Sequence, residues 1–175
     1  MAAVGCFLTQ NLKDLACTFT VAGVSRILLI EWENVVSVTK VNEQVTVITL
    51  VDDTFFYEVL ADFNAGFTQE YAVSGSNRYF THSVQFTIPY YDLVTMSEME
   101  NLFKGNKAMA LVQKKDGKWI LLGEFSGMKA TAGSAGSGIN EGDEAGISIT
   151  LSGANTGMAP LVAPGIVPAL IFVAP

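Results

Sequence analysis

Charged residues are scarce in this sequence. They make up 15% of its 175 residues, while hydrophobic residues make up 50%. A folded monomer normally keeps a charged surface, so this composition predicts that part of the surface is buried against partners. The sequence argues against a membrane protein, because no stretch of about 20 apolar residues runs without polar interruption. The longest apolar stretch, residues 158–175, contains four prolines, which a spanning helix does not tolerate.

Basic residues are also few. Ten Lys and Arg residues stand against 17 Asp and Glu residues, which gives a formal net charge of -7. This balance disfavours binding of DNA or RNA through the phosphates. It is compatible with a surface that nucleic acid passes without adhering and, more simply, with solubility. The first ten residues carry no positive charge and no long apolar segment, so we expect no signal peptide.

Cysteine and histidine are nearly absent, since the chain has only Cys6, Cys17 and His82. This spacing lacks the paired ligands of a zinc site, and both cysteines are expected to be small buried hydrophobic residues. His82 lies in an alternating segment with no local nucleophile or carboxylate, so we expect a structural role for it. The sequence therefore predicts no enzyme activity, no cofactor and no bound metal.

The pattern that is present is typical of β-structure. Segments rich in β-branched and aromatic residues, several of them alternating with polar residues, are separated by turn residues and predict strands. The predicted strands are 21–30, 35–41, 45–51, 54–60, 67–74, 77–88, 107–113, 118–124 and 147–151. Asp116-Gly117 predicts the tight turn of a hairpin between the seventh and the eighth of these segments.

One short helix is predicted after Pro89. Met96, Met99 and Leu102 recur at helical spacing, so the helix would place one apolar stripe on a sheet. Thr95 begins a capping-box pattern, and Gly105 suits the position that follows a helix.

The last third of the chain carries two unusual segments. Residues 127–146 are rich in Gly, Ser and Ala, and because glycine costs most to order we predict a long loop there. Its acidic part, 140–144, lacks the spacing of a known calcium loop and is expected to be solvated or to meet a partner. Residues 154–175 are uncharged, apolar and interrupted by prolines, which predicts an extended arm. The arm would lie on a neighbouring subunit or fold back on its own domain, and the sequence leaves both open.

The order of these elements resembles the tail tube (major tail) proteins of tailed bacteriophages. The residues that carry the resemblance are the helix SEMENLFKGN (97–106), the hairpin ALVQKKDGKWILLGE (110–124), the ending GMKATAGSAGSGINEGDEAGISITLSG (127–153) and the start MAAVGCFLTQNLKDLAC (1–17). The similarity is good over about 110–153 and looser over the first half of the chain.

The resemblance implies a β-sandwich or β-barrel tube domain over residues 1–153, flanked by the helix and followed by the arm over 154–175. It further implies rings of six copies that stack into a hollow tube, whose lumen residues 67–88 would line. DNA would pass through this tube without specific binding. The partners would be other copies of the chain and other phage tail proteins, in a virion assembled in the host cytoplasm, and no membrane would be involved.

The glycine-rich segment, its acidic end and the apolar arm are the expected contacts between subunits. The predicted interface residues are Gly133, Gly136, Gly138, Glu141, Asp143, Glu144, Leu161, Val162, Ile166 and Val167. Two alternatives stay open. One is another virion component, such as a capsid decoration protein or a tail terminator or connector. The other is a sugar-binding β-sandwich that stacks sugar rings on aromatic side chains, namely Trp32, Tyr90, Tyr91 and Trp119.

Overall fold

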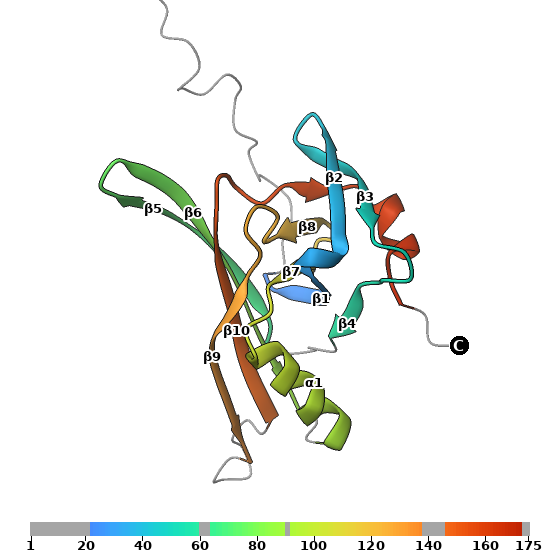
Figure 1. Ribbon diagram of the computed structural model, residues 1–175, viewed down its shortest axis with the longest axis vertical. Helices are drawn as coiled ribbons and strands as arrows, with labels where there is room; N and C mark the ends of the chain where they lie inside the picture. Colours follow the sequence, from blue (N-terminus) through green and yellow to red (C-terminus); the bar gives the residue numbers. More distant parts are fainter. Residues whose placement is uncertain (1–21, 60–63, 90–91, 138–145, 173–175) are drawn as a thin grey trace, which may run out of the picture.

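The computed structural model describes residues 22–59, 64–89, 92–137 and 146–172. Over these residues the protein consists of two β-sheets and one α-helix (Figure 1), which confirms the expectation of a mainly β protein with one short helix. The elements in chain order are β1 (Val24–Glu31), η1 (Trp32–Asn34), β2 (Val35–Val41), β3 (Gln44–Leu50), β4 (Tyr57–Val59), β5 (Gly66–Ser74), β6 (Asn77–Ile88), α1 (Leu93–Phe103), β7 (Ala108–Lys114), β8 (Trp119–Leu122), β9 (Lys129–Gly136), β10 (Gly146–Asn155), β11 (Leu161–Val162) and η2 (Pro164–Ala169).

The larger sheet has seven strands in the order β2-β3-β11-β8-β7-β1-β4. Its central strands are covered on both faces, so their side chains are apolar in almost unbroken runs rather than in alternation. In β1, for example, Ile27 and Leu29 belong to the core between the two sheets, whereas Leu28 and Ile30 belong to a second core on the outer side. That second core lies beneath the C-terminal 3-10 helix η2, which covers the sheet at the right of Figure 1.

The smaller sheet has four strands in the order β5-β6-β10-β9, all antiparallel. Its strands alternate, and only one face is apolar. Val84 and Phe86 of β6 and Ile149 and Leu151 of β10 are fully or almost fully buried against the larger sheet. The hydrophobic effect therefore holds the two sheets together through this one face and leaves the opposite face to solvent.

The helix α1 closes one end of the core between the sheets, where Met99 is buried. Asp92, and not the predicted Thr95, is the N-cap residue, since its side chain accepts a hydrogen bond from the Thr95 backbone N–H at 2.7 Å. The helix accordingly begins at Leu93, three residues before the capping-box pattern suggested. Gly105 follows the helix with a φ of +91°, as predicted.

The predicted loop over 127–146 is wrong for residues 129–136, which form strand β9 along β10. Its small residues serve packing as well as flexibility. At Gly133 an added Cβ would lie 2.2 Å from the Phe103 ring of α1, so the absence of a side chain lets the helix approach the strand. Composition alone suggested a loop because pairing with β10, which supplies the backbone hydrogen bonds of β9, is not visible in the local sequence.

Of the two courses that the sequence left open for the arm, residues 154–172 follow the second and fold back on the chain's own domain. They are not extended throughout, since Pro164–Ala169 form η2. Strand β11 pairs parallel with β3 and antiparallel with β8, and Ile171 bridges to Phe56. Val162 and Val167 are 3% and 2% exposed in the outer core. Burial of this uncharged apolar segment stabilises the fold because the segment covers the apolar outer face of the central strands, which would otherwise meet water. The expected boundary between residues 153 and 154 falls within β10.

The other strand predictions vary in accuracy. The segments 35–41 and 77–88 coincide with β2 and β6. Of the segment 54–60, Leu60 lies outside the described residues, and among the rest only Tyr57–Val59 form strand β4. The reason is a turn before it, in which Asp53 has a φ of +61° and the Thr54 hydroxyl donates to the Val51 carbonyl at 2.6 Å.

Candidate functional site: the polar face and edges of the smaller sheet

The solvent-facing side of the smaller sheet is covered by short hydroxyl and amide side chains. Strand alternation and register place nine of them there: Thr68, Thr81, Ser83, Gln85, Thr87, Ser134, Ser148, Thr150 and Ser152. The pattern follows from period-2 alternation, because every second residue of β6 and β10 is apolar and points into the core. We call this surface the polar face.

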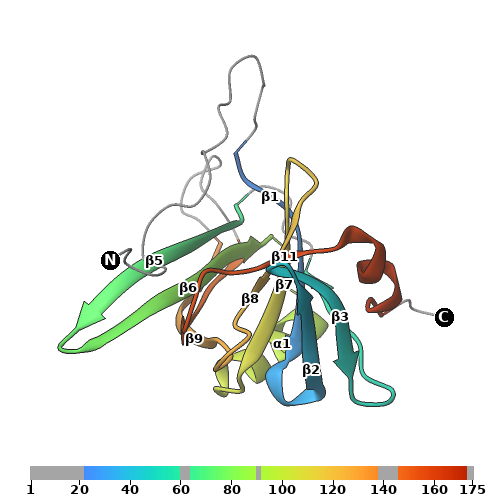
Figure 2. The same cartoon turned by 90° about the horizontal axis from the view of Figure 1, so that it is seen from above.

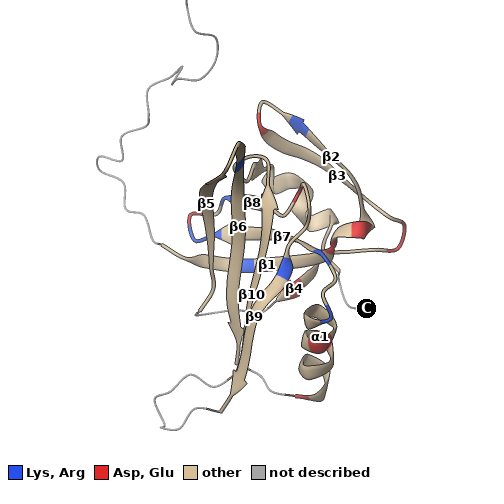
Figure 3. Cartoon of the chain, turned by 60° about the vertical axis from the view of Figure 1, so that its left-hand side comes forward, with Lys and Arg blue, Asp and Glu red and all other residues tan. Residues whose placement is uncertain are grey.

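Charge is almost missing from the polar face. By the same alternation, Glu70 of β5 and Lys129 at the start of β9 are its only charged residues within the described part of the sheet. Figure 3 shows this side of the molecule as a nearly uncoloured sheet, whereas Lys, Arg, Asp and Glu cluster on turns and on α1. Part of the hydrogen-bonding capacity is used internally, since the Ser83 hydroxyl donates to the Leu151 carbonyl at 3.2 Å and the Thr87 hydroxyl to Ser148 at 3.3 Å.

Both edges of the smaller sheet are open over the residues that the structure describes. Strand β5 pairs only with β6, and β9 pairs only with β10. An unpaired strand edge offers a row of backbone N–H and C=O groups that can pair with another chain. Along β9 the residues from 131 to 136 are all exposed and small, so little side-chain bulk protects that edge.

The β5–β6 hairpin extends beyond the body of the molecule (Figures 1 and 2). Pairing of β6 with β10 ends at Phe80, and from there the hairpin continues as two strands. Tyr71 and Val73 in this part are 56% and 57% exposed, and the Tyr71 ring packs 5.5 Å from the Phe80 ring. The apolar face of the sheet thus continues past the core with nothing from the described chain covering it.

A hollow of about 500 Å³ lies on the polar face near the start of β5. Its described lining consists of hydroxyl and amide side chains together with Ala65, Gly66 and Phe67, and among these residues there is no carboxylate, histidine, cysteine or lysine. The described lining can donate and accept hydrogen bonds, but it carries no group suited to acid, base or nucleophilic chemistry.

His82 has a structural setting. It is 2% exposed, and its Nε2 donates to the Gly157 carbonyl at 3.0 Å, while Nδ1 has no hydrogen-bond partner among the described residues. Burial lowers the pKa of His82 below its usual value, and the Gly157 hydrogen bond and the charge of Glu124 offset this only in part. The side chain therefore fixes β6 to the segment that follows β10, in keeping with the predicted structural role.

No cluster of three or more His, Cys, Asp or Glu residues suited to hold a metal ion occurs among the described residues. The acidic segment 140–144 lies outside them, as do Cys6 and Cys17. Within the described chain, no helix has both the length and the apolar character to cross a membrane.

The predicted interface residues fall into three groups. Gly133 and Gly136 lie on the exposed edge strand β9. Leu161 is 46% exposed and Ile166 is half-buried, whereas Val162 and Val167 are covered by the chain itself. The remaining four, Gly138, Glu141, Asp143 and Glu144, lie outside the described residues. The role of all ten residues in subunit contacts stays a prediction.

The two tryptophans of the sugar-binding alternative do not form an exposed platform. Trp119 is 5% exposed, and Arg26 lies 5.6 Å from its ring centre. Trp32 is half-buried, its indole N–H donates to the Glu124 carbonyl at 3.0 Å, and Lys107 lies over its ring at 5.1 Å. Tyr90 and Tyr91 lie outside the described residues.

Sequence reasoning found β5, β6 and β10 of the polar face, but neither β9 nor the face itself. The signal was the Ser, Thr and Gln residues that alternate with apolar residues in 81–88 and 147–152. What local sequence could not show is that β6 and β10 are neighbours, so that their polar residues join one surface. Comparison of the chain with protein-family models, with curated proteins and with solved structures gave no significant match.

Proposed function

We propose that this protein is a structural subunit that assembles with its own copies into rings stacked as a hollow tube, the tail tube of a tailed bacteriophage. In this function it has no enzyme activity. Its partners are further copies of the chain and other tail proteins of the virion, and DNA passes through the tube.

The observation that carries the proposal is the polar face. A tube that conducts DNA needs a lining that is hydrated yet does not bind phosphate, because Lys or Arg residues would retain the polyanion. A wide sheet of hydroxyl and amide side chains with only Glu70 and Lys129 as charges meets this requirement. The strands β5 and β6 belong to the segment 67–88 that the family resemblance assigned to the lumen.

The open edges and the projecting hairpin support self-assembly. If β5 of one copy lies beside β9 of the next, the smaller sheets of a ring join and their polar faces form one inner surface. The uncovered apolar side chains of the hairpin, Tyr71 and Val73, would then be buried against a neighbouring copy. The low charge of the chain, 15% of its residues, is in keeping with extensive burial between subunits.

The direct test is negative-stain electron microscopy of the purified full-length chain over a rising concentration series, with mass photometry in parallel. Stacked rings or tubes with a central channel are expected. Trimers or single closed rings would favour another virion component, and monomers that persist under all conditions would refute the proposal.

A pair of matched variants tests the role of the β9 edge. Ala132→Lys with Ser134→Lys places two bulky charges along the exposed edge strand and is expected to abolish ring formation. Thr39→Lys with Ser37→Lys makes the same change on β2, an edge strand of the larger sheet, and should leave rings intact. Circular dichroism melts confirm that both variants are folded. Rings of normal size in the β9 variant would show that this edge does not join subunits.

A further inference from the structure

The turn between β7 and β8 is a basic site on an acidic protein. It carries Lys114, Lys115 and Lys118 around one carboxylate, Asp116, which lies 3.2 Å from the Lys114 ammonium and 3.8 Å from that of Lys118. Lys115, Asp116 and Lys118 are exposed, and no carboxylate pairs with Lys115 among the described residues. Three of the ten basic residues of the chain thus gather on one five-residue turn with a net positive charge.

A groove with an apolar lining and an acidic rim lies between α1 and the edge strand β4, with a volume of about 730 Å³. Its apolar lining comes from both elements and from the turn before β4, and includes Phe55, Tyr57, Met99 and Leu102. Phe55 and Tyr57 are 37% and 59% exposed, and the Phe172 ring packs 6.0 and 5.4 Å from theirs. An exposed aromatic group of this kind is a candidate contact surface.

The rim of the groove is acidic. Glu31, Asp53 and Glu98 line it and are all exposed, and none of the three takes part in an ion pair within the described chain. Glu58, also in the lining, is held by Arg26 at 2.6 Å. The basic residue of the lining, Lys107, lies over the Trp32 ring, so its charge only partly offsets the three carboxylates.

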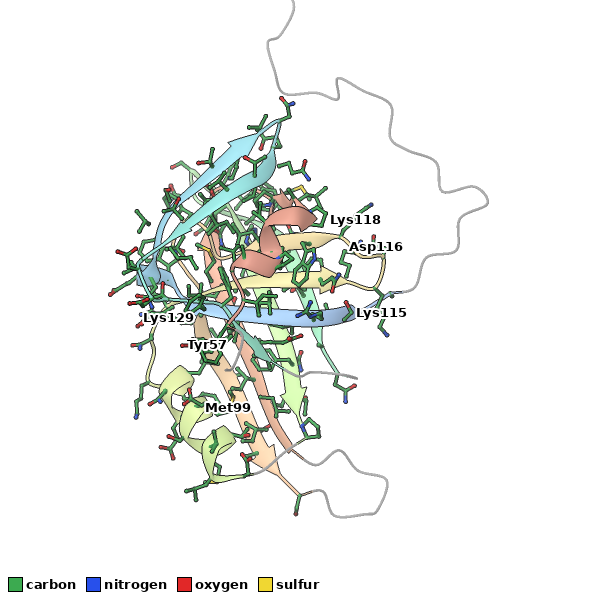
Figure 4. The ribbon with its side chains drawn as sticks, turned by 90° about the vertical axis from the view of Figure 1, so that its right-hand side faces the viewer. Tyr57, Met99, Lys115, Asp116, Lys118 and Lys129 are labelled. Carbon is green, nitrogen blue, oxygen red and sulfur yellow. The ribbon has the colours of Figure 1, made fainter. Side chains whose placement is uncertain are left out.

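Turn and groove lie at opposite ends of the same strand pair. In the register of β1 with β7, Val24 faces Lys114 at the turn and Glu31 faces Ala108 at the groove. Seven residue steps separate the two ends of β1, which is about 23 Å at about 3.3 Å per residue. Figure 4 shows the same separation, with Lys115, Asp116 and Lys118 at one side of the molecule and Tyr57 and Met99 away from them.

We propose that the β7–β8 turn of one copy docks in the groove between α1 and β4 of the next copy. This inference deepens the proposed function, on which it rests, by assigning a head-to-tail contact between subunits. Charge complementarity selects the occupant, because the chain itself supplies a compact group of lysines to match a groove with unpaired carboxylates. The lysine stems suit the aromatic lining, and their ammonium groups reach the rim or the Tyr57 ring face.

We assign the contact as head-to-tail because the proposed function requires an assembly that continues from copy to copy. Each such assembly then leaves one turn and one groove free at its ends for the next copy. Repetition yields a closed ring or an open stack, according to the rotation between copies.

Charge reversal of either side is the test. Lys115→Glu with Lys118→Glu makes the turn acidic, and Glu31→Lys with Glu98→Lys makes the groove basic. Each variant alone is expected to associate at least about tenfold more weakly than wild type in sedimentation velocity at low salt, because like charges then meet. Lys104→Glu with Ser37→Glu and Thr39→Glu lowers the net charge by the same four units as the turn variant, but outside turn, groove and smaller sheet, and should associate as wild type.

Mixing supplies the decisive measurement. In an equimolar mixture the two variants can alternate. Each acidic turn then meets a basic groove, and each unchanged basic turn meets an unchanged acidic groove, so association should return to within about threefold of wild type. Wild-type association should also weaken as ionic strength rises. If the single variants assemble normally, or if the mixture does not recover, the contact is wrong while the tube proposal stands. If wild type never associates, both proposals fail.

Discussion

The two sheets of this protein bury their strands differently. The central strands of the larger sheet have apolar neighbours on both sides, so β7 and β8 contain the runs AMALV and WILL with every residue buried. The strands β6 and β10 of the smaller sheet are buried on one side only and alternate. The larger sheet is thus an internal scaffold, and the smaller one is free to present a surface.

This difference shows where function can be located. Nearly every side chain of β7 and β8 is needed for packing, so those strands cannot vary without loss of stability. On the polar face, the side chains contribute little to the core and their chemistry can be set by what passes or binds there. This contrast between the two sheets can be tested by comparing the stability cost of a substitution in one sheet with that of a similar substitution in the other.

The largest effect is expected from a charge placed in the scaffold. Leu111 of β7 is 0% exposed, so Leu111→Asp buries an unpaired carboxylate and should cost more than about 4 kcal/mol of unfolding free energy. Thr150→Asp, on the polar face, should cost less than about 1 kcal/mol. Urea denaturation followed by circular dichroism measures both. Similar losses for the two variants would refute the contrast between the sheets.

A second, smaller effect is expected where β10 crosses the segment after β8. At Gly153 an added Cβ would lie 2.2 Å from the Gly127 carbonyl oxygen, which is backbone and cannot turn aside. Gly153→Ala should therefore cost about 3 kcal/mol. Gly136→Ala, with no atom within 4 Å of the new methyl group, should change stability by less than about 1 kcal/mol. Equal denaturation midpoints for both would show that the close approach is relaxed in solution.

A pH-dependent effect is expected from His82, which joins the smaller sheet to the segment after β10. Its pKa is lowered by burial, so the unfolded chain, with a value near 6.5, binds the proton more readily than the folded one. Stability should be complete above about pH 6.5 and fall as the pH drops below it. His82→Gln keeps a donor for Gly157 but cannot be protonated, so its unfolding free energy should stay level between about pH 7.5 and 5.5. An unchanged slope in the variant would assign the pH dependence to other groups.

The smallest effect is expected at the N-terminus of α1. Asp92→Ala removes the acceptor of the Thr95 N–H and should lower the melting temperature slightly, whereas Asp92→Asn keeps an acceptor and should melt as wild type. Because hydrogen bonds from the Thr95 side chain and then from its backbone N–H lower the pKa of Asp92, the charged form stabilises the helix, and this contribution disappears as the pH falls below the usual value near 3.8. Identical melting temperatures for wild type and both variants would show that Asp92 does not stabilise the helix as its N-cap.

Local sequence patterns predicted most strands because their signals act over a few residues. The alternation of 77–88 and the Asp116-Gly117 turn each depend only on neighbouring residues, and both are found in the structure as expected. The missed strand β9 and the course of the arm, which the sequence left open, have one cause. Residues 129–136 and 161–172 are ordered by partners distant in the chain, namely β10, β3, β8 and the outer core. Neither the groove nor the polar face could be predicted, since each combines residues of several elements.

The sequence by itself determined that this is a mainly β protein with one short helix and low charge, because side-chain period and composition act locally. Only the tertiary structure decided that a glycine-rich segment is a strand, that the apolar tail covers its own sheet, and that scattered Ser and Thr residues form one surface. The physical reason is that burial and strand pairing reward contacts between segments far apart in the chain, and such contacts leave no mark within any one of them.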